Sequence, residues 1–280
     1  MDLIHPIFKW LHIIAGVVWI GLLYFFNFIN GHFAATLDSD SKKKVVPELM
    51  PRTLYWFRWG AAWTWVTGIV LLLVIYWLGA EGLMPADFTS DEITGDGPNM
   101  FIHFLLAFTF LAVFIYDYIY KSSLASNVRL VTILSFILIG LYVFAMENLA
   151  NFEYRTFNIH LGAMFGTNMA FNVWFRIWPA QQKIISAIKN GEAPDSNLVA
   201  LAGLRSKHNT YMSVPLIWTM IAVHHTGTSL SGGKWIPFLH PRNVLHDELG
   251  TLWVGLMIFI ALGWHIVFQL YKKSAKIKGF

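Results

Sequence analysis

The sequence lacks cysteine altogether and has little charge for its length. None of its 280 residues is cysteine, which excludes disulfides, thiolate zinc sites, iron–sulfur clusters and covalently attached c-type haem. Charged residues make up only 13% of the chain, whereas a soluble domain carries about 25%. Hydrophobic residues reach 56%, and the mean hydropathy is +0.53. Because so little polar surface cannot cover a globule of this size in water, we expect an integral membrane protein.

Seven apolar stretches are long enough to cross a bilayer as helices, for which roughly 20 residues are needed. They lie near residues 7–29, 60–80, 101–120, 128–147, 156–178, 211–231 and 249–270. The first follows no basic segment and has no small-residue cleavage site, so we expect it to stay as a helix rather than to be removed as a signal peptide. The sequence therefore predicts an all-α integral membrane protein, a seven-transmembrane-helix bundle that forms a single domain over residues 1–280.

The distribution of Lys and Arg predicts the orientation of this bundle, because positively charged loops stay in the cytoplasm. The loops after the first, third and fifth stretches, their borders and the tail carry all but four of the 20 Lys and Arg residues. The four exceptions are Lys9, Arg155, Lys234 and Arg242. We therefore expect the N-terminus outside and the C-terminus in the cytoplasm.

Two of the predicted loops have a composition of their own. The outer loop from Glu81 to Asn99 holds five acidic residues and no Lys or Arg. It is either a solvated surface loop or a landing surface for a basic soluble partner such as a cytochrome c, which complementary charge would steer. In the inner loop after the fifth stretch, we expect a short surface helix over residues 181–189, ended by Asn190 and Gly191.

Histidine is the metal-binding side chain that remains, and five histidines fall on the outer half of the predicted bundle. They are His12, His103, His160, His224 and His225. An ionisable residue inside a membrane is costly and is a candidate for function. With no cysteine and no deep carboxylates, facing neutral imidazoles are typical of axial ligands to haem iron, so we expect one or two haem b groups. The alternative for any one histidine is a hydrogen-bonded packing role.

Two helix faces accompany these histidines. Steps of three and four residues place on the face of His12 the residues Gly16, Trp19, Leu23 and Asn27. The same steps give a polar stripe along the helix of His160, made of Met164, Thr167, Asn168 and Asn172. Amides near mid-membrane need partners or line a polar cavity, so we expect Asn168 and Asn172 to contact a planar purine-like or quinone-like substrate. The G-x-x-x-G step of Gly162 and Gly166 favours close helix packing.

Other ionisable residues lie near the two ends of the predicted bundle. Glu147 is expected at the outer mouth beside the helix of His160, where a carboxylate orients a histidine or accepts a proton; a surface role is the alternative. On the cytoplasmic side, a second set is either hydrated at the interface or part of a second haem site or proton path. It consists of His32, His208, His265 and Asp117.

Three blocks of the sequence resemble the N-terminal membrane domain of bacterial urate hydroxylase, also described as the urate oxidase N-terminal membrane domain. The first has W-L-H at 10–12, W-I-G at 19–21 and F-F-N at 25–27. The second has N-I-H-L-G-A at 158–163, N-V-W at 172–174 and I-W-P-A-Q at 177–181. The third has R-S-K-H-N-T-Y at 205–211, followed by Ser213 and Pro215. The first block alone also resembles small haem-binding protoporphyrinogen oxidases of bacteria.

The resemblance implies a haem b oxidoreductase of the bacterial inner membrane that hydroxylates urate to 5-hydroxyisourate and passes electrons to cytochrome c. We expect the haem ligands among the five outer histidines, first His12 and His160, then one of His224 and His225, then His103. We expect the catalytic or substrate-contacting residues to be Asn168, Asn172 and Glu147. The family typically continues into a C-terminal cytochrome c domain, whereas this sequence has no C-x-x-C-H, so the expected partner is a separate cytochrome c.

Two other functions stay open at this point. One is a non-catalytic, haem-bearing membrane subunit of a respiratory electron-transfer complex. The other is a protoporphyrinogen-linked or quinol-linked haem oxidoreductase. A transporter is disfavoured because the apolar stretches show no obvious inverted repeat. The basic residues follow membrane topology, so membrane lipid is an expected partner and nucleic acid is not.

Overall fold

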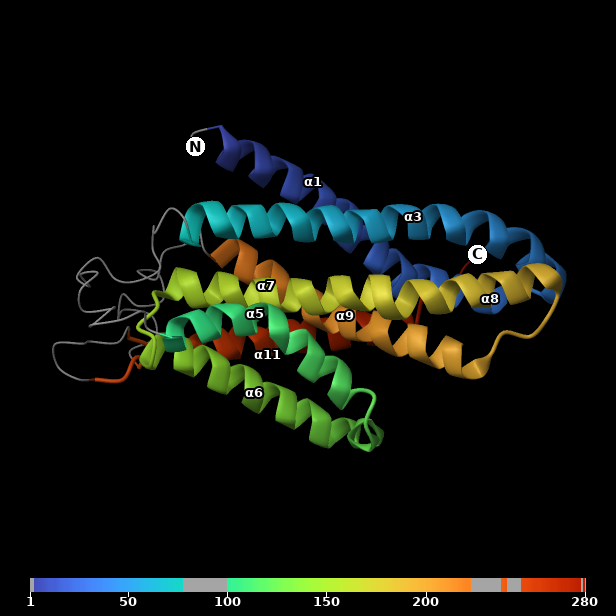
Figure 1. The fold of residues 1–280 in the computed structure, drawn as a ribbon. Coiled ribbons are helices and arrows are strands. Elements are labelled where there is room, and N and C mark those ends of the chain that lie inside the picture. Colours follow the sequence, from blue (N-terminus) through green and yellow to red (C-terminus); the bar gives the residue numbers. More distant parts are fainter. Residues whose placement is uncertain (1–2, 78–99, 223–237, 241–247, 278, 280) are drawn as a thin grey trace. The chain divides into compact units, whose positions relative to one another are not determined.

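The computed structural model describes residues 3–77, 100–222, 238–240, 248–277 and 279, and every regular element within these ranges is a helix (Figure 1). In chain order the elements are α1 (Ile4–Tyr24), η1 (Phe25–Asn30), α2 (Gly31–Thr36), α3 (Ser39–Leu72), η2 (Leu73–Trp77), α5 (Met100–Ile119), η3 (Ser123–Ser126), α6 (Val128–Asn148), α7 (Tyr154–Asn172), η4 (Val173–Ile177), α8 (Trp178–Asn190), α9 (Ser196–Ala222) and α11 (Leu252–Ser274). The prediction of an all-α fold is confirmed. Three of the elements, η1, η2 and η4, are π-helical turns that continue an α-helix.

Five of the described helical stretches are long and apolar enough to cross a membrane, which indicates a multi-pass membrane protein. They are Ile4–Thr36, Ser39–Trp77, Phe101–Ile119, Val128–Asn148 and Leu252–Ser274. α7 and α9, which cover the other two predicted spans, do not meet this criterion, because amides, hydroxyls and histidines interrupt their apolar sequence. The count of seven spans and their orientation stay predictions, and the last nine residues of the span at 211–231 lie outside the described residues.

The observed helices overrun the predicted spans at several boundaries. α3 and η2 together form 39 helical residues, which at about 1.5 Å per residue is roughly 58 Å, nearly twice the hydrocarbon thickness of a bilayer. The expected basic loop at 30–59 is therefore helical apart from the turn at Leu37 and Asp38. α5, α6 and α11 begin and end close to the predicted positions.

The chain divides into two compact units. Unit 1 comprises residues 1–71, 166–214 and 263–280, and unit 2 comprises residues 72–165 and 215–262. Four helices therefore contribute residues to both units, namely α3, α7, α9 and α11.

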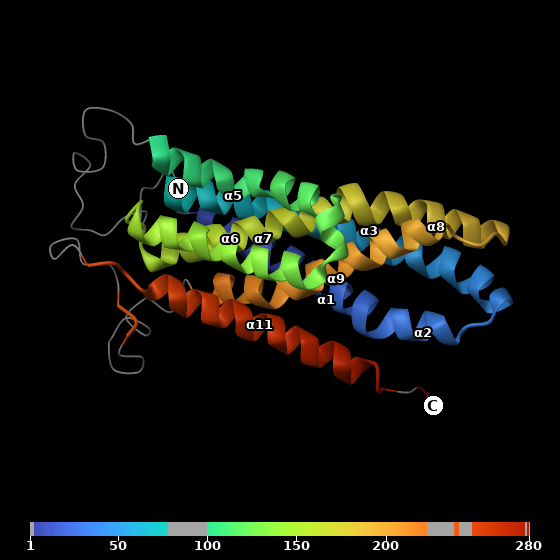
Figure 2. The same ribbon diagram turned by 90° about the horizontal axis from the view of Figure 1, so that it is seen from below.

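Unit 1 begins with α1, which runs through η1 into α2 before the chain turns back into α3 (Figure 2). At this turn the Asp38 carboxylate accepts hydrogen bonds from the Ser41 backbone N–H at 2.9 Å and from the Ser41 hydroxyl at 2.8 Å. These bonds hold the pKa of the exposed Asp38 carboxyl below its ordinary value, the backbone N–H having the larger effect. Further along, a side chain at Gly60 would meet the Trp19 backbone N at 3.2 Å, so glycine there allows α1 and α3 to approach closely.

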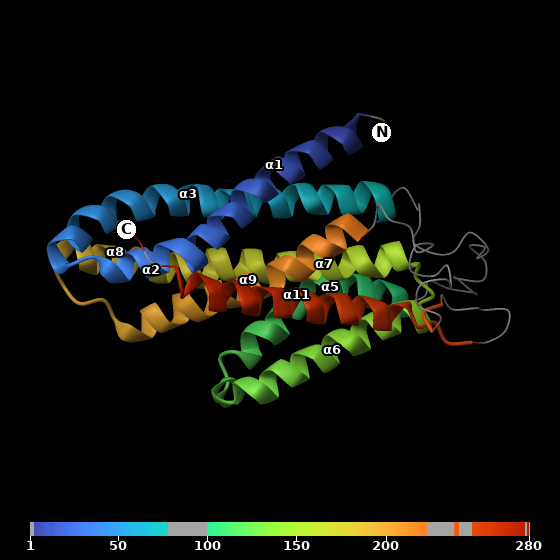
Figure 3. The same cartoon turned by 180° about the vertical axis from the view of Figure 1, so that it is seen from behind.

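The second part of unit 1 is the pair formed by α8 and the first part of α9 (Figure 3). Their contact is a small apolar cluster made of Ala180, Ile184, Ile188, Leu198 and Ala202. α8 ends at Gly191, whose φ of +79° lies in the left-handed region that glycine adopts without strain. The predicted surface helix at 181–189 is thus confirmed, and it begins three residues earlier, at Trp178, with Pro179 in its first turn.

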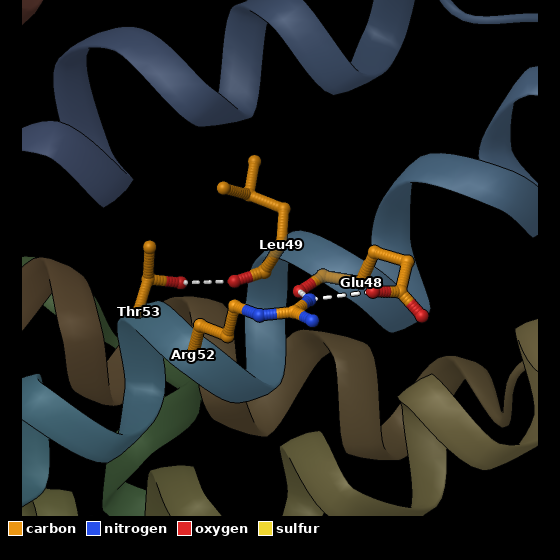
Figure 4. Close-up of polar contacts among 4 residues, drawn as sticks. All are labelled: Glu48, Leu49, Arg52 and Thr53. Carbon is orange, nitrogen blue, oxygen red and sulfur yellow. Dashed lines mark hydrogen bonds and ion pairs between the residues drawn. The ribbon is translucent and has the colours of Figure 1, made fainter.

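α3 continues through two prolines, Pro47 and Pro51, each of which lacks the N–H that a helix needs at that position. In this region polar side chains make hydrogen bonds within the helix, mainly to its backbone carbonyls (Figure 4). The Arg52 guanidinium donates to the backbone carbonyl of Glu48 and to its carboxylate at 2.6 Å, and the Thr53 hydroxyl donates to the Leu49 carbonyl at 3.0 Å. Arg52 and Glu48 are exposed, so their ion pair adds little stability beyond this local role.

Unit 2 contains the α5–α6 hairpin, two antiparallel helices joined by the turn that holds η3 (Figure 1). The buried hydroxyls of Thr109 and Tyr142 are 2.7 Å apart and hydrogen-bond across the pair. One face of α6 is apolar and exposed, with Ile133 at 59% and Leu141 at 59% exposed. An outward apolar face of this size is expected of a helix that contacts lipid.

Candidate functional site

His12 lies on α1 of unit 1, half-buried against α3. Its Nδ1 is 2.9 Å from the Thr64 backbone oxygen and 3.2 Å from the Thr67 hydroxyl. Because a carbonyl oxygen only accepts, Nδ1 must carry the proton, which leaves the lone pair on Nε2. This orientation by a backbone carbonyl is the one that metal-bound histidines commonly have. Gly68 lets the ring lie against α3, since a Cβ there would meet His12 Cε1 at 3.0 Å.

The predicted face of α1 is confirmed. Trp19 and Leu23 are the two fully buried residues of α1, and Gly16 faces Thr64 of α3 at ordinary contact distance. Asn27, in η1, donates to the Ser206 hydroxyl at 2.8 Å and accepts from the Tyr271 hydroxyl at 2.8 Å. The face of His12 therefore points into unit 1 and ends in a hydrogen-bonded polar group.

His160 lies on α7 in unit 2 and is completely buried. Its Nδ1 donates to the Thr156 carbonyl at 2.7 Å, and its Nε2 accepts from the Trp77 indole N–H at 3.2 Å. Phe152 stacks on the ring at 6.3 Å between centroids, and Tyr76 meets it edge-on at 6.0 Å. Both nitrogens of His160 are thus occupied by protein groups, in contrast to those of His12. The π-helical turn η2 supplies both Tyr76 and Trp77.

The predicted haem ligands fit a haem iron to different degrees. Within the described ranges, no three His, Asp or Glu side chains gather as a protein-only metal site would require, but haem needs one or two imidazoles. His12 fits, because Nε2 carries the lone pair; His160 fits once the Trp77 indole leaves Nε2. His103 is exposed at the start of α5. His224 and His225 lie outside the described residues.

The amides predicted to contact substrate lie in unit 1. Asn172 donates from Nδ2 to Asn209 Oδ1 at 2.9 Å, and Asn209 donates to the Met169 carbonyl at 3.0 Å. Both amides are fully buried, so this pair joins α7 to α9 by hydrogen bonds inside the unit. Asn168 is 8% exposed, and its Oδ1 has no hydrogen bond. Asn168 therefore keeps a free acceptor for a ligand, whereas the donor of Asn172 is already used.

Glu147 is buried at the end of α6 in unit 2 rather than hydrated at the surface. Its carboxylate accepts the backbone N–H groups of Leu252 at 3.3 Å and Trp253 at 2.8 Å. Beside it, Asn148 exchanges two hydrogen bonds with the backbone of Gly250, at 2.7 and 3.2 Å. Glu147 therefore caps the N-terminus of α11, where negative charge is favourable. Its predicted catalytic role stays a prediction.

The predicted cytoplasmic set divides in the structure. His32 and His265 are exposed, His208 is half-buried, and all three belong to unit 1. His265 Nε2 is 3.0 Å from the Gln269 side-chain nitrogen. Asp117, in unit 2, pairs with Lys121 at 2.9 Å. A hydrated position at the interface, a second haem site and a proton path all stay predictions for this set.

Three buried polar groups of unit 2 that the sequence did not single out lie along α7 and α9. They are the Tyr154 hydroxyl, both amide atoms of Asn158 and the Trp218 indole nitrogen, none of which makes a hydrogen bond. Gly162 belongs to the same face of α7, and a Cβ there would collide with Thr219 of α9. The predicted close packing of the G-x-x-x-G step is confirmed at Gly162, whereas Gly166 has open space around it.

Charge gathers at the start of α7. Arg155 is exposed and interacts with the Tyr76 hydroxyl, while Glu153 is half-buried just before the helix. Burial raises the pKa of the Glu153 carboxyl, and the positive charge of Arg155 opposes this shift. The first turn of α7 thus presents a cation beside buried polar groups.

The residues that sequence reasoning missed are mostly partners from other helices. Thr156 could have been found, because the carbonyl four residues before a helical histidine is a common acceptor. Trp77 is 83 residues away from His160, and Trp218 is 60 or more residues away from Asn158 and Tyr154. No spacing in the sequence indicates such pairs.

These features define a multi-pass helical membrane protein in which helix carbonyl groups orient the rings of His12 and His160. The model of one family, described as urate oxidase N-terminal, matches residues 37–240. Because the match covers more than half of the chain, this protein belongs to the urate oxidase N-terminal family. The sequence blocks at 158–181 and 205–215 lie inside the matched residues, and the block at 10–27 lies outside them. Comparison with curated proteins and with solved structures found no match.

Proposed function

We propose that this protein is a urate-hydroxylase-like membrane oxidoreductase that converts urate to 5-hydroxyisourate. In the reaction, one water adds its oxygen to a ring carbon of urate, and two electrons and two protons leave. A cytochrome c, as a separate subunit or a soluble protein at the outer face, accepts the two electrons one at a time in two molecules. Family membership is the observation that carries this proposal.

The chain offers His12 as the first ligand for haem b, because Thr64 orients its ring and Nε2 keeps the lone pair. When bound, haem supplies one-electron transfer between substrate and acceptor. We place His160 second, then one of His224 and His225, then His103. Arg155, exposed at the first turn of α7, attracts the urate anion.

We further propose that the chain crosses the bacterial inner membrane seven times, with the N-terminus outside. The absence of native cysteine makes a direct test simple, since single cysteines can be introduced at the two ends of α6. Ser126 and Leu149 are both exposed. In intact cells an impermeant maleimide should label the Leu149→Cys protein and leave Ser126→Cys unlabelled until the cells are broken. The reverse pattern would overturn the orientation.

The function is tested on the purified full chain in two measurements. A pyridine-haemochrome assay should find b-type haem, and urate should drive the reduction of added ferric cytochrome c. Absence of haem would overturn the cofactor assignment. Haem without urate-dependent reduction would favour a non-catalytic electron-transfer subunit, and reduction by protoporphyrinogen or quinol alone would favour the other alternative.

The assignment of His12 has a matched control on the same helix. His12→Ala should lose most of the bound haem, whereas His5→Ala, an exposed position about two turns before, should retain it. Full haem content and an unchanged reduced spectrum in His12→Ala would show that another residue holds the iron.

A further inference from the structure

The face of α7 that packs on α9 in unit 2 carries Tyr154, Asn158 and Gly162, which are spaced by four residues and therefore lie one above another. Two contacts fix α9 opposite this face. A Cβ on Gly162 would collide with the Thr219 side chain and would meet Met220 Cε at 3.0 Å. The Trp218 indole N–H is directed at the Tyr154 hydroxyl, but the two groups do not reach the geometry of a full hydrogen bond.

The polar atoms on this face are buried without partners. Asn158 is 0% exposed, and neither its Nδ2 nor its Oδ1 makes a hydrogen bond. The Tyr154 hydroxyl and the Trp218 indole nitrogen are also buried without hydrogen bonds. Packing holds their rings in place, since Trp218 stacks on Phe259 at 3.7 Å and 10°, and Tyr154 meets Phe157 edge-on at 5.3 Å.

Such an arrangement is unfavourable in the protein alone. A buried amide with both atoms unpaired loses its hydrogen bonds to water and gains none, and native proteins hold few groups of this kind. Glu147 and Asn148, buried in the same unit, do have their hydrogen bonds at the start of α11. The unpaired groups near Asn158 are therefore explained by a ligand that supplies the missing donors and acceptors.

The chemistry of the three groups specifies that ligand. The Asn158 amide offers one acceptor beside two donors in a plane, the Trp218 indole offers a donor, and the Tyr154 hydroxyl offers either. A planar ring with N–H next to C=O, as in the ureide edges of urate, pairs with an amide through two parallel hydrogen bonds. We infer that Asn158, with Tyr154 and Trp218, is the recognition site for the ureide edge of the substrate, an inference that rests on the proposed function.

The position in the chain suits an anionic substrate. Tyr154 is the first residue of α7, so Asn158 lies about 6 Å inside the helix start. Arg155 is exposed in the same first turn and attracts an anion to this end. At Gly162, one turn beyond Asn158, Thr219 fills the space between α7 and α9.

The test measures urate binding to the purified full chain by calorimetry, without cytochrome c. Asn158→Leu should weaken binding roughly 10- to 100-fold, because two hydrogen bonds are lost, and Tyr154→Phe should weaken it roughly 3- to 10-fold. Tyr142→Phe is the matched control, since this buried tyrosine of unit 2 already bonds Thr109. It should lower the melting temperature and leave urate affinity unchanged, whereas Tyr154→Phe should leave the melting temperature unchanged.

N-methylated urates give a second measurement that a merely structural effect would not reproduce. Methylation at the ring nitrogen of the recognised edge should abolish much of the affinity of the native protein. In Asn158→Leu and in Trp218→Phe, the difference in affinity between urate and the methylated urate should nearly disappear. Trp218→Phe keeps an aromatic ring stacked on Phe259. If urate affinity and this discrimination are unchanged in these variants and in Tyr154→Phe, the inference is overturned. That result is expected if only water occupies the site, and it leaves the proposed function intact. Failure of the native protein to bind urate would overturn the proposed function itself.

Discussion

α7 and α9 contact each other in both units, and the buried polar groups are hydrogen-bonded at one contact and not at the other. In unit 1 the amides of Asn172 and Asn209 bond each other, and Asn209 also bonds the Met169 carbonyl. In unit 2 the amide of Asn158 bonds nothing, and Tyr154 and Trp218 beside it are equally unpaired. The same two helices thus carry one satisfied buried amide pair and one unsatisfied amide.

This difference indicates that the Asn172–Asn209 pair contributes to stability, whereas Asn158 contributes to ligand binding. A satisfied buried amide pair stabilises a helix contact and specifies its register, because breaking it leaves a buried group without a partner. An unsatisfied amide weakens the fold and is explained when a ligand completes its hydrogen bonds. The two histidines differ in a related way, since His160 has partners on both nitrogens and His12 on one.

The largest predicted effect separates the two amides directly. Asn209→Leu leaves the Asn172 donor and the Met169 carbonyl buried without their partner, so it should cost about 3 kcal/mol of stability. Asn158→Leu removes groups that had no partner, so the melting temperature should stay the same or rise. Thermal denaturation of the two purified variants in the same detergent measures the contrast. Equal destabilisation by both would mean that Asn158 has a structural partner.

Glu147 tests whether unit 2 also contains polar groups that act in stability. Glu147→Ala leaves the N–H groups of Leu252 and Trp253 without their acceptor, so it should cost about 2 kcal/mol. The melting temperature of the variant gives this cost, and urate affinity measured alongside should not change. A stable variant that loses urate-dependent turnover would instead support a catalytic carboxylate.

The two glycines of the G-x-x-x-G step give a smaller contrast. Gly162→Ala places a methyl group against Thr219, so it should cost about 1 to 2 kcal/mol through overpacking. Gly166→Ala meets nothing within 4 Å, so it should be neutral or stabilise the helix by roughly 0.5 kcal/mol. Melting temperatures that fall equally in both variants would contradict the packing seen at Gly162.

The smallest effect belongs to the exposed cap at Asp38, and it depends on pH. Because the folded pKa of Asp38 is lowered by Ser41, the stability it contributes is present above the ordinary aspartate pKa and is lost as the pH falls through the lowered value. Asp38→Ala should therefore melt slightly below the native protein at neutral pH, and the two melting curves should converge in acid. A gap that persists or widens in acid would show a role other than this cap.

The helices themselves could be predicted from the sequence, because long apolar runs in a membrane must satisfy their backbone hydrogen bonds internally, as a helix does. The face of His12 was also predictable, since a period of 3.6 residues brings Trp19 and Leu23 to one side. The extent of α3 was not predictable. Lys42 and the prolines at 47 and 51 are typical of a loop, yet the helix continues through them.

The candidate site was predictable only in its histidines and amides. Sequence order does not reveal that Trp77 fills the second nitrogen of His160, or that Asn209 takes the donor of Asn172. Asn158 stands in the N-I-H-L-G-A block, yet nothing in that string says that its amide is unpaired. Pairing between distant helices is a property of packing, and it decides which polar residues are free to bind.

The π-helical turn η2 has an evolutionary consequence. Such a turn holds one more residue per hydrogen-bonded turn than an α-helix does, so losing a single residue from 73–77 would restore regular helix. The side chains within this turn would then change position, and the Trp77 indole would move away from His160. A one-residue deletion on a different helix, with His160 itself untouched, would therefore be enough to release Nε2 and turn a packed histidine into an available ligand.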